Sequence, residues 1–303
     1  MKKGNLTAHL AVLGANIIFG LNYVIAKGIM PHWMEPRAII FLRVTGATAA
    51  FWLVEMFTSR EKVARKDLKR MFILAIFGVA VNQILFFEGL NLTTPINASI
   101  IMVGTPILVL LMSRFVIGDK ISGRKLLGII LGFSGAAFLI LRNGHLTLSS
   151  DTTLGNLLVL INAASYGLFL VMVKPLMSKY RPLTVMKWVF TFGLIFVIPV
   201  SIGEVIHTNF SIIPLNIWFS IMYVVIFTTI FAYFLNNYSL QKISPSANSS
   251  YMYLQPILAS LVAIFAGKDK LTMTEIVASL LIFTGVFFVN KKRGGNSMTQ
   301  AGA

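Results

Sequence analysis

The chain has 303 residues, of which 56% are hydrophobic and only 12% are charged, and it carries a formal net charge of +16. Its mean hydropathy of +0.81 lies far above that of an ordinary globular domain, so the composition excludes a soluble fold and indicates an integral membrane protein. Cysteine is absent, which excludes disulfide bonds and thiolate metal sites.

Apolar segments recur along the whole chain, separated by short polar breaks. Each is roughly 18 to 23 residues long, enough to cross about 30 Å of hydrocarbon as a helix. The first follows Lys2 and Lys3, but it lacks the small-residue cleavage site of a signal peptide, so we expect it to be retained. In chain order the ten predicted spans are 8–30, 37–57, 70–90, 95–117, 125–141, 154–175, 183–205, 214–236, 245–266 and 273–290. We therefore expect an all-α integral membrane protein with ten transmembrane helices.

The basic residues gather in alternate breaks between these spans. If the N-terminus lies in the cytoplasm, 18 lysines and arginines fall on that side, against Arg37, Arg142, Lys268 and Lys270 on the other. Such a bias in short loops follows the positive-inside rule. It accounts for the net charge without a nucleic-acid partner. We expect both termini to lie in the cytoplasm.

The second half of the chain repeats the first. Pro95, Pro106, Asp119 and Gly135 recur, 150 residues later, as Pro245, Pro256, Asp269 and Gly285. The segment 20–27 also matches 167–174 at a shift of 147. Five spans per copy is an odd number, so the second copy enters the bilayer from the opposite face, a recurring design of secondary transporters. We predict inverted repeats at 1–145 (spans 1–5) and 150–293 (spans 6–10), and a cytoplasmic tail at 294–303.

Several motifs resemble those of the drug/metabolite transporter superfamily, specifically the EamA-type permeases. In the first copy they are FGLNYVIAK at 19–27, FLRV at 41–44, TPINASIIMVGTPILVLL at 94–111 and GDKISGRKLLGIILGFSG at 118–135. In the second copy they are ISPSANSSYMYLQPILASL at 243–261, GKDKLT at 267–272 and IFTG at 282–285. The family commonly has glutamate at the positions of Asp119 and Asp269. The resemblance implies a multi-pass exporter in the bacterial cytoplasmic (inner) membrane that uses no cofactor and no metal.

Two mid-span prolines predict where a substrate binds. Pro106 and Pro256 lie near the centres of spans 4 and 9, where a proline kinks the helix and frees a carbonyl group that lipid cannot satisfy. Kinked spans at corresponding places in two repeats point to a transporter's site. Polar residues around these prolines and in other spans complete the predicted site: Asn16, Asn22, Asn82, Gln83, Asn97, Ser99, Tyr166, Ser249, Tyr251, Tyr253 and Gln255. Any one of them could instead join two helices, whereas the cluster favours a cavity.

Charged residues within the spans leave alternatives open. Arg43 could bind a substrate carboxylate or phosphate, or it could pair with Glu88. Lys27 and Lys174 could act as gates or counter-charges, or they could extend to lipid headgroups. Glu88 could relay protons, although a uniporter or an exchanger is equally compatible.

Glycines in spans 5 and 10 predict packing instead. Gly128, Gly132 and Gly135 form a small-residue strip, echoed by Ala278 and Gly285, that allows two helices to approach closely.

These features favour a secondary transporter of a small metabolite, such as an amino acid or a related organic compound. The alternatives are a channel-like pore and an exchanger of nucleotide sugars or organic anions. An ATP-driven pump is disfavoured because GDKISGRK has Arg124 where a phosphate-binding loop needs lysine. An enzyme is disfavoured because the histidines are scattered and the spans carry no catalytic constellation.

Overall fold

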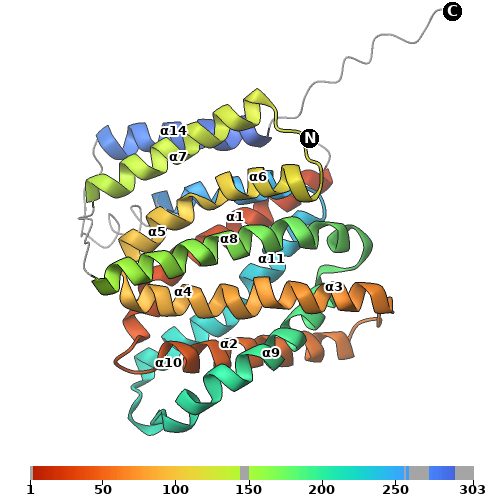
Figure 1. The fold of residues 1–303 in the computed structure, drawn as a ribbon, viewed down its shortest axis with the longest axis vertical. Helices are drawn as coiled ribbons and strands as arrows, with labels where there is room; N and C mark the ends of the chain where they lie inside the picture. The colour runs from red at the N-terminus through yellow and green to blue at the C-terminus, as the bar shows by residue number, and fades with distance from the viewer. Residues whose placement is uncertain (1–2, 144–149, 256, 259–272, 291–303) are drawn as a thin grey trace, which may run out of the picture.

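The computed structural model describes residues 3–143, 150–255, 257–258 and 273–290. Within these ranges every regular element is a helix (Figure 1). The elements are α1 (Lys3–Ile29), α2 (Pro36–Met56), α3 (Arg65–Ala75), η1 (Ile76–Ala80), α4 (Val81–Leu92), α5 (Pro95–Val103), α6 (Thr105–Val116), α7 (Gly123–Asn143), α8 (Ser150–Lys179), α9 (Pro182–His207), η2 (Phe210–Ile212), α10 (Leu215–Met222), η3 (Tyr223–Phe231), α11 (Ala232–Leu240), α12 (Pro245–Ser249), η4 (Ser250–Tyr253) and α14 (Met273–Asn290). Pro256, Lys268, Asp269, Lys270 and the predicted tail lie outside the described residues.

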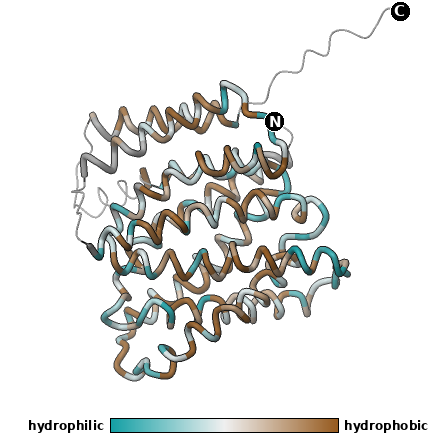
Figure 2. The backbone as a smooth tube through the Cα atoms, in the orientation of Figure 1, coloured by the Kyte–Doolittle hydropathy of each residue, from teal (hydrophilic) through white to brown (hydrophobic). Residues whose placement is uncertain are grey.

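Seven helical segments of the described chain are long and apolar enough to cross a membrane. They are Leu6–Ile29, Pro36–Met56, Arg65–Leu92, Asn97–Val116, Asp151–Lys179, Pro182–His207 and Leu215–Leu240. Apolar residues fill the middle of these helices, and polar residues gather towards their ends (Figure 2). Many large apolar side chains face outward, among them Val24, Leu53 and Phe219. Such a surface suits lipid, so the chain is a multi-pass membrane protein.

The three other predicted spans are not among these seven. Segment 125–141 forms the greater part of α7, and 273–290 coincides with α14. Segment 245–266 begins with α12 and η4 and then continues beyond the described residues. The count of ten spans therefore stays a prediction.

Three of the long segments are interrupted near their middle. A π-helical turn, η1, separates α3 from α4, and a second, η3, separates α10 from α11. The third segment breaks at Gly104, and Pro106 lies in the first turn of the new helix α6, where a missing N–H has no cost. The predicted kink at Pro106 therefore corresponds to a one-residue interruption at Gly104, between α5 and α6. Interruptions of this kind in membrane helices are tolerated where the freed backbone groups line a cavity or find a neighbour.

The helices pack in pairs that join distant parts of the chain. Helix α2 packs against α9, α7 against α14, α4 against α8, and α1 against α11. In Figure 1, α7 and α14 form one outer layer, α2, α9 and α10 lie at the opposite side, and the remaining helices lie between them. The central layer therefore has helices from both halves of the chain.

The α7–α14 pair meets along small residues, as predicted. A Cβ atom added at Gly128 would lie 2.7 Å from the carbonyl oxygen of Gly285, and one at Gly135 would lie 2.8 Å from that of Ala278. Because both distances are shorter than any real Cβ contact, the two backbones can approach this closely only without side chains at these positions. The predicted packing strip is confirmed.

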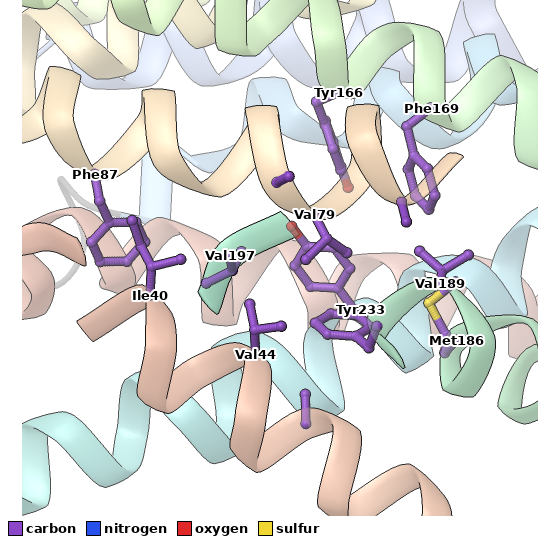
Figure 3. Close-up of a cluster of buried hydrophobic side chains, with 14 of the residues drawn as sticks. Ile40, Val44, Val79, Phe87, Tyr166, Phe169, Met186, Val189, Val197 and Tyr233 are labelled. Atoms are coloured by element: carbon purple, nitrogen blue, oxygen red, sulfur yellow. The ribbon is translucent and has the colours of Figure 1, made fainter. Parts of the chain in front are cut away.

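The main apolar core lies at the other side of the bundle, around Tyr233. Its ring lies among Val44, Val79 and Val189, which come from α2, η1 and α9 (Figure 3). Residues of both halves thus meet at one point. The hydroxyl end of Tyr233 points out of this core, towards the polar groups described next.

Candidate functional site

A cavity of about 640 Å³, including its mouth, lies at the centre of the bundle. Helices α1, α2, α4, α5, α8, η3, α11, α12 and η4 all contribute to its wall. The lining residues are Asn16, Phe19, Asn22, Tyr23, Arg43, Asn82, Gln83, Phe86, Phe87, Met102, Asn162, Tyr166, Thr228, Tyr233, Asn236, Asn248, Met252 and Gln255. The wall is a mixture of amides, tyrosines, apolar rings and one guanidinium.

The structure brings half of the predicted substrate-site residues together in this wall. They are Asn16, Asn22, Arg43, Asn82, Gln83, Tyr166 and Gln255. Although these residues lie up to 239 positions apart in sequence, as Asn16 and Gln255 do, they surround one space. Their role in binding a substrate stays a prediction.

One end of the wall is held by a chain of hydrogen bonds between α1 and the segment after η4. Gln255 Nε2 donates to Asn16 Oδ1 at 2.8 Å, and Tyr23 Oη donates to Gln255 Oε1 at 3.3 Å. Asn16 Nδ2 donates in turn to the carbonyl oxygen of Val12 at 2.8 Å. These bonds fix the side-chain rotamer of Gln255 before any ligand arrives.

A second network crosses from α4 to α8 and α11. Asn82 Nδ2 donates to Asn162 Oδ1 at 2.6 Å, while Tyr233 Oη donates to Asn82 Oδ1 at 2.8 Å. Asn236 Nδ2 donates to Tyr166 Oη at 3.0 Å. Because each group restrains the next, this side of the cavity is also pre-organised.

Arg43 supplies the only cation in the lining that the structure describes. Its side chain is buried, with a relative exposure of 3%. The Nε atom donates to Thr229 Oγ1 at 2.8 Å, and the guanidinium carbon lies 4.4 Å from the centre of the Phe87 ring. The alternative pairing with Glu88 is wrong in this structure, because Glu88 forms its ion pair with Arg37, at 2.5 Å.

Six other residues of the predicted site lie in the described part of the chain but do not line the cavity. Ser249 donates to the carbonyl oxygen of Ser246, and Tyr251 Oη lies 2.8 Å from His9 Nδ1. Tyr253 is fully buried against α7, where a Cβ at Gly132 would meet its ring at 2.3 Å. Asn97, Ser99 and Pro106 on α5 and α6 are also absent from the lining, and Pro256 lies outside the described residues.

Gln255 and Tyr253 lie on different faces of the segment that contains η4. Asn248, Met252 and Gln255 all line the cavity, and their spacing of four and three residues places them on one helical face. Tyr253 follows Met252 by one residue and points towards α7 instead. The sequence alone did not show which of these faces is turned to the cavity.

Lys27 and Lys174 make contacts that were not predicted from the sequence. Lys27 Nζ donates to the carbonyl oxygens of Leu90, at 2.9 Å, and Asn91, at 2.7 Å, at the end of α4. Lys174 Nζ donates to those of Leu240, the last residue of α11, and of Ile243, just beyond it. Carbonyl groups at a helix C-terminus have no partner within the helix and favour a cation. Both lysines therefore cap a helix, and neither lines the cavity.

Six polar residues of the lining were missed in the sequence: Tyr23, Asn162, Thr228, Tyr233, Asn236 and Asn248. A signal for Tyr233 was present, since a shift of 150 residues places it on Gln83. Within the described residues no three His, Asp or Glu side chains lie close enough to hold a metal ion.

A polar cavity enclosed by membrane-spanning helices from both halves of a chain is the arrangement found in membrane transporters. The sequence profile of the EamA-like transporter family matches this chain twice, at residues 6–141 and 153–291. The protein belongs to the EamA-like transporter family, which confirms the resemblance drawn from its motifs.

Relatives with known sequences extend over nearly the same length. The uncharacterized transporter YyaM of Bacillus subtilis is 24% identical over 93% of both chains. A probable terminal-alkyne amino-acid exporter of Streptantibioticus cattleyicolor is 21% identical over 84% of this chain and 83% of its own. A solved crystal structure has a TM-score of 0.74 over 94% of this chain and 98% of its own, at 16% identity, which shows that the fold is shared.

Proposed function

We propose that this protein is a secondary transporter that moves a small organic metabolite across the membrane by alternating access. The observation that carries the proposal is the pre-organised polar cavity, whose wall comes from both halves of the chain. A site near the bilayer midplane, between two repeats, is where secondary transporters bind their substrates. The transporter-named relatives favour this function over that of an enzyme.

Ten spans in two inverted five-span repeats are part of this proposal. The double match of the family profile supports two copies. The packing supports a two-fold relation between them, because α2 pairs with α9 and α7 with α14, which are the second and fifth spans of each proposed copy. The first span of each proposed copy also packs against the third span of the other copy, since α1 packs against α11 and α8 against α4. Lys27 and Lys174, related by a shift of 147, cap equivalent helices.

Two ion pairs at opposite ends of the α2–α9 interface support alternating access. Lys187 Nζ lies 2.5 Å from Glu55 Oε1, and both side chains are buried. At the other end, Arg37 Nε lies 3.6 Å from Glu204 Oε1, and both are more exposed. A shift of 150 relates Arg37 to Lys187, and a shift of 149 relates Glu55 to Glu204. We propose that the Glu55–Lys187 and Arg37–Glu204 pairs are equivalent clasps, that is, ion pairs that each hold one end of the α2–α9 interface closed. The Glu55–Lys187 clasp is the tighter of the two in the state described.

The direction, membrane and cargo are proposed from the relatives and the charge distribution. The Streptantibioticus exporter supports outward transport of amino acids or related compounds. The positive-inside bias supports cytoplasmic termini, and a bacterial inner membrane follows from the bacterial relatives. Coupling to protons or to a counter-substrate is compatible with this structure.

Counterflow into liposomes tests the function. Purified protein is reconstituted, the liposomes are loaded with unlabelled amino acids or organic acids, and uptake of the labelled solute is measured. Saturable uptake that depends on the internal solute is expected. Flux that rises linearly with the external solute concentration and does not depend on the internal solute would support a channel-like pore and contradict the proposal.

A further inference from the structure

The charge inside the cavity points to a more specific class of substrate. We infer that the transported molecule is an organic monocarboxylate, and that the terminal nitrogens of Arg43 bind its carboxylate. This inference rests on the proposed transport function, and it narrows the proposed cargo of amino acids and related compounds to carboxylates without a charged ammonium group. Its support comes from the charge balance of the cavity, the orientation of Arg43 and the nature of the surrounding wall.

The positive charge of Arg43 has no acidic partner in the part of the chain that the structure describes. No aspartate or glutamate belongs to the described lining. Glu55, on the same helix as Arg43, is paired with Lys187, and Glu88 of α4 is paired with Arg37. A buried charge without a counter-ion is strongly unfavourable, so an anion entering this cavity gains a large electrostatic stabilisation.

The contacts of Arg43 leave one edge of the guanidinium for a ligand. Thr229 accepts the Nε–H bond and is itself held by a bond from its Oγ1 to the carbonyl oxygen of Val224, at 2.8 Å. Phe87 lies against the guanidinium. These two contacts fix the plane of the group, while its two terminal nitrogens make no hydrogen bond within the described residues. Two parallel N–H groups match the two oxygens of a carboxylate.

The number of charges favours a monocarboxylate over other anions. One guanidinium neutralises one negative charge, whereas a phosphate monoester carries close to two. A zwitterionic amino acid would also bring an ammonium group, for which the described lining offers no carboxylate. The rest of the molecule would contact the apolar groups Phe19, Phe86, Met102 and Met252, with amides available for its polar substituents.

Matched pairs of probes test the inference directly. Binding of benzoate, phenylacetate and hexanoate to the purified full chain is compared, by titration calorimetry, with binding of their neutral amides. Phenyl phosphate and L-phenylalanine complete the panel. At least one acid should bind about 10-fold or more tightly than its amide. The two parallel N–H groups of the guanidinium form a fork of charge-assisted hydrogen bonds with a carboxylate, whereas an amide makes only a neutral contact. Equal affinities in every pair would overturn the inference, as would tightest binding of phenyl phosphate or L-phenylalanine.

Variants assign the preference to Arg43. Arg43→Gln should abolish the preference for the acid, and Arg43→Lys should keep a reduced one, because lysine is a point charge without the fork. Arg114→Gln is the matched control, since Arg114 is exposed at the end of α6 and should keep the full preference. An acid preference that survives in a folded Arg43→Gln protein would refute the role of Arg43. If the Gln variant does not fold, an undiminished preference in Arg43→Lys would refute the fork.

The outcome can be separated from that of the transport proposal. If wild-type liposomes show saturable counterflow of amides as readily as of acids, transport stands and the carboxylate inference fails. If acids bind selectively but no solute gives counterflow, the binding of a carboxylate by Arg43 stands and the transport function fails.

Discussion

Lys187 of α9 and Glu55 of α2 form an ion pair of 2.5 Å inside the bundle, where both side chains are less than 10% exposed. The ammonium group also lies over two indole rings, 4.4 Å from that of Trp52 and 4.8 Å from that of Trp188. A buried pair of this kind contributes little net stability compared with an apolar replacement, but losing one partner is costly because a bare charge remains.

Glu55→Gln should therefore destabilise the protein by about 3 to 5 kcal/mol. The measurement is thermal unfolding of the purified protein in detergent. The exchanged variant Glu55→Lys/Lys187→Glu restores both charges and should recover part of the loss. Single and exchanged variants with equal melting temperatures would contradict the pairing.

The clasp proposal predicts that the two ends of the α2–α9 interface have opposite effects. Met252→Cys places a single thiol in the cavity wall, because the native chain has no cysteine. Neutralising both Glu55 and Lys187 should speed labelling of this thiol from the cytoplasmic face by about 10-fold, the effect of a shift of about 1.4 kcal/mol between two states. Neutralising both Arg37 and Glu204 is the matched comparison and should speed labelling from the other face. The same direction of change in both variants would argue against alternating clasps.

The amide network predicts energetic coupling between α4 and α11. Asn82→Ala and Tyr233→Phe each remove one side of a buried hydrogen bond and should cost about 1 to 3 kcal/mol of unfolding free energy. Because they share this bond, the double variant should cost less than the sum, by about 0.5 kcal/mol or more. Denaturant titrations of the four proteins give the coupling energy. Strict additivity would mean that the hydrogen bond contributes nothing.

The α7–α14 contact predicts a sharp difference between two glycines of one helix. Gly128→Ala would place a methyl group against the backbone of Gly285 and should destabilise the protein by about 1 to 3 kcal/mol. Gly123→Ala, at the start of the same helix, meets nothing within 4 Å and is the control. The melting temperatures of both variants are compared with that of the unchanged protein. If Gly128→Ala does not lower the melting temperature, the two helices do not pack this closely.

The two helix-capping lysines predict an effect on stability and none on substrate affinity. Lys27→Met and Lys174→Met should each lower the unfolding free energy by about 0.3 to 1 kcal/mol, because the carbonyl groups at a helix end lose their cation. The dissociation constant of a transported solute should not change. A loss of affinity with normal stability would restore the interpretation of these lysines as counter-charges.

Much of the polar wall could be predicted from the sequence, and the errors have identifiable causes. Asn16, Asn82 and Arg43 were found because an amide or a charge in the middle of an apolar span is costly and conspicuous. Tyr253 was misplaced because the polar segment 248–255 does not show in its sequence which of its helical faces is turned to the cavity. Asn162 and Asn236 were missed because the sequence of one span does not indicate which side chains of distant spans its polar residues contact.

By itself, the sequence determined the class of protein. Apolar length and composition require membrane helices, and the motifs that recur at 95–135 and 245–285 place the chain in its family. Only the tertiary structure decided which polar groups share the cavity and that Arg43 lacks an acidic partner there among the described residues. The reason is physical: in a bilayer both the lipid-facing and the core-facing sides of a helix are apolar. The hydropathy pattern that marks the buried face of a helix in water therefore carries little information about which side faces inward.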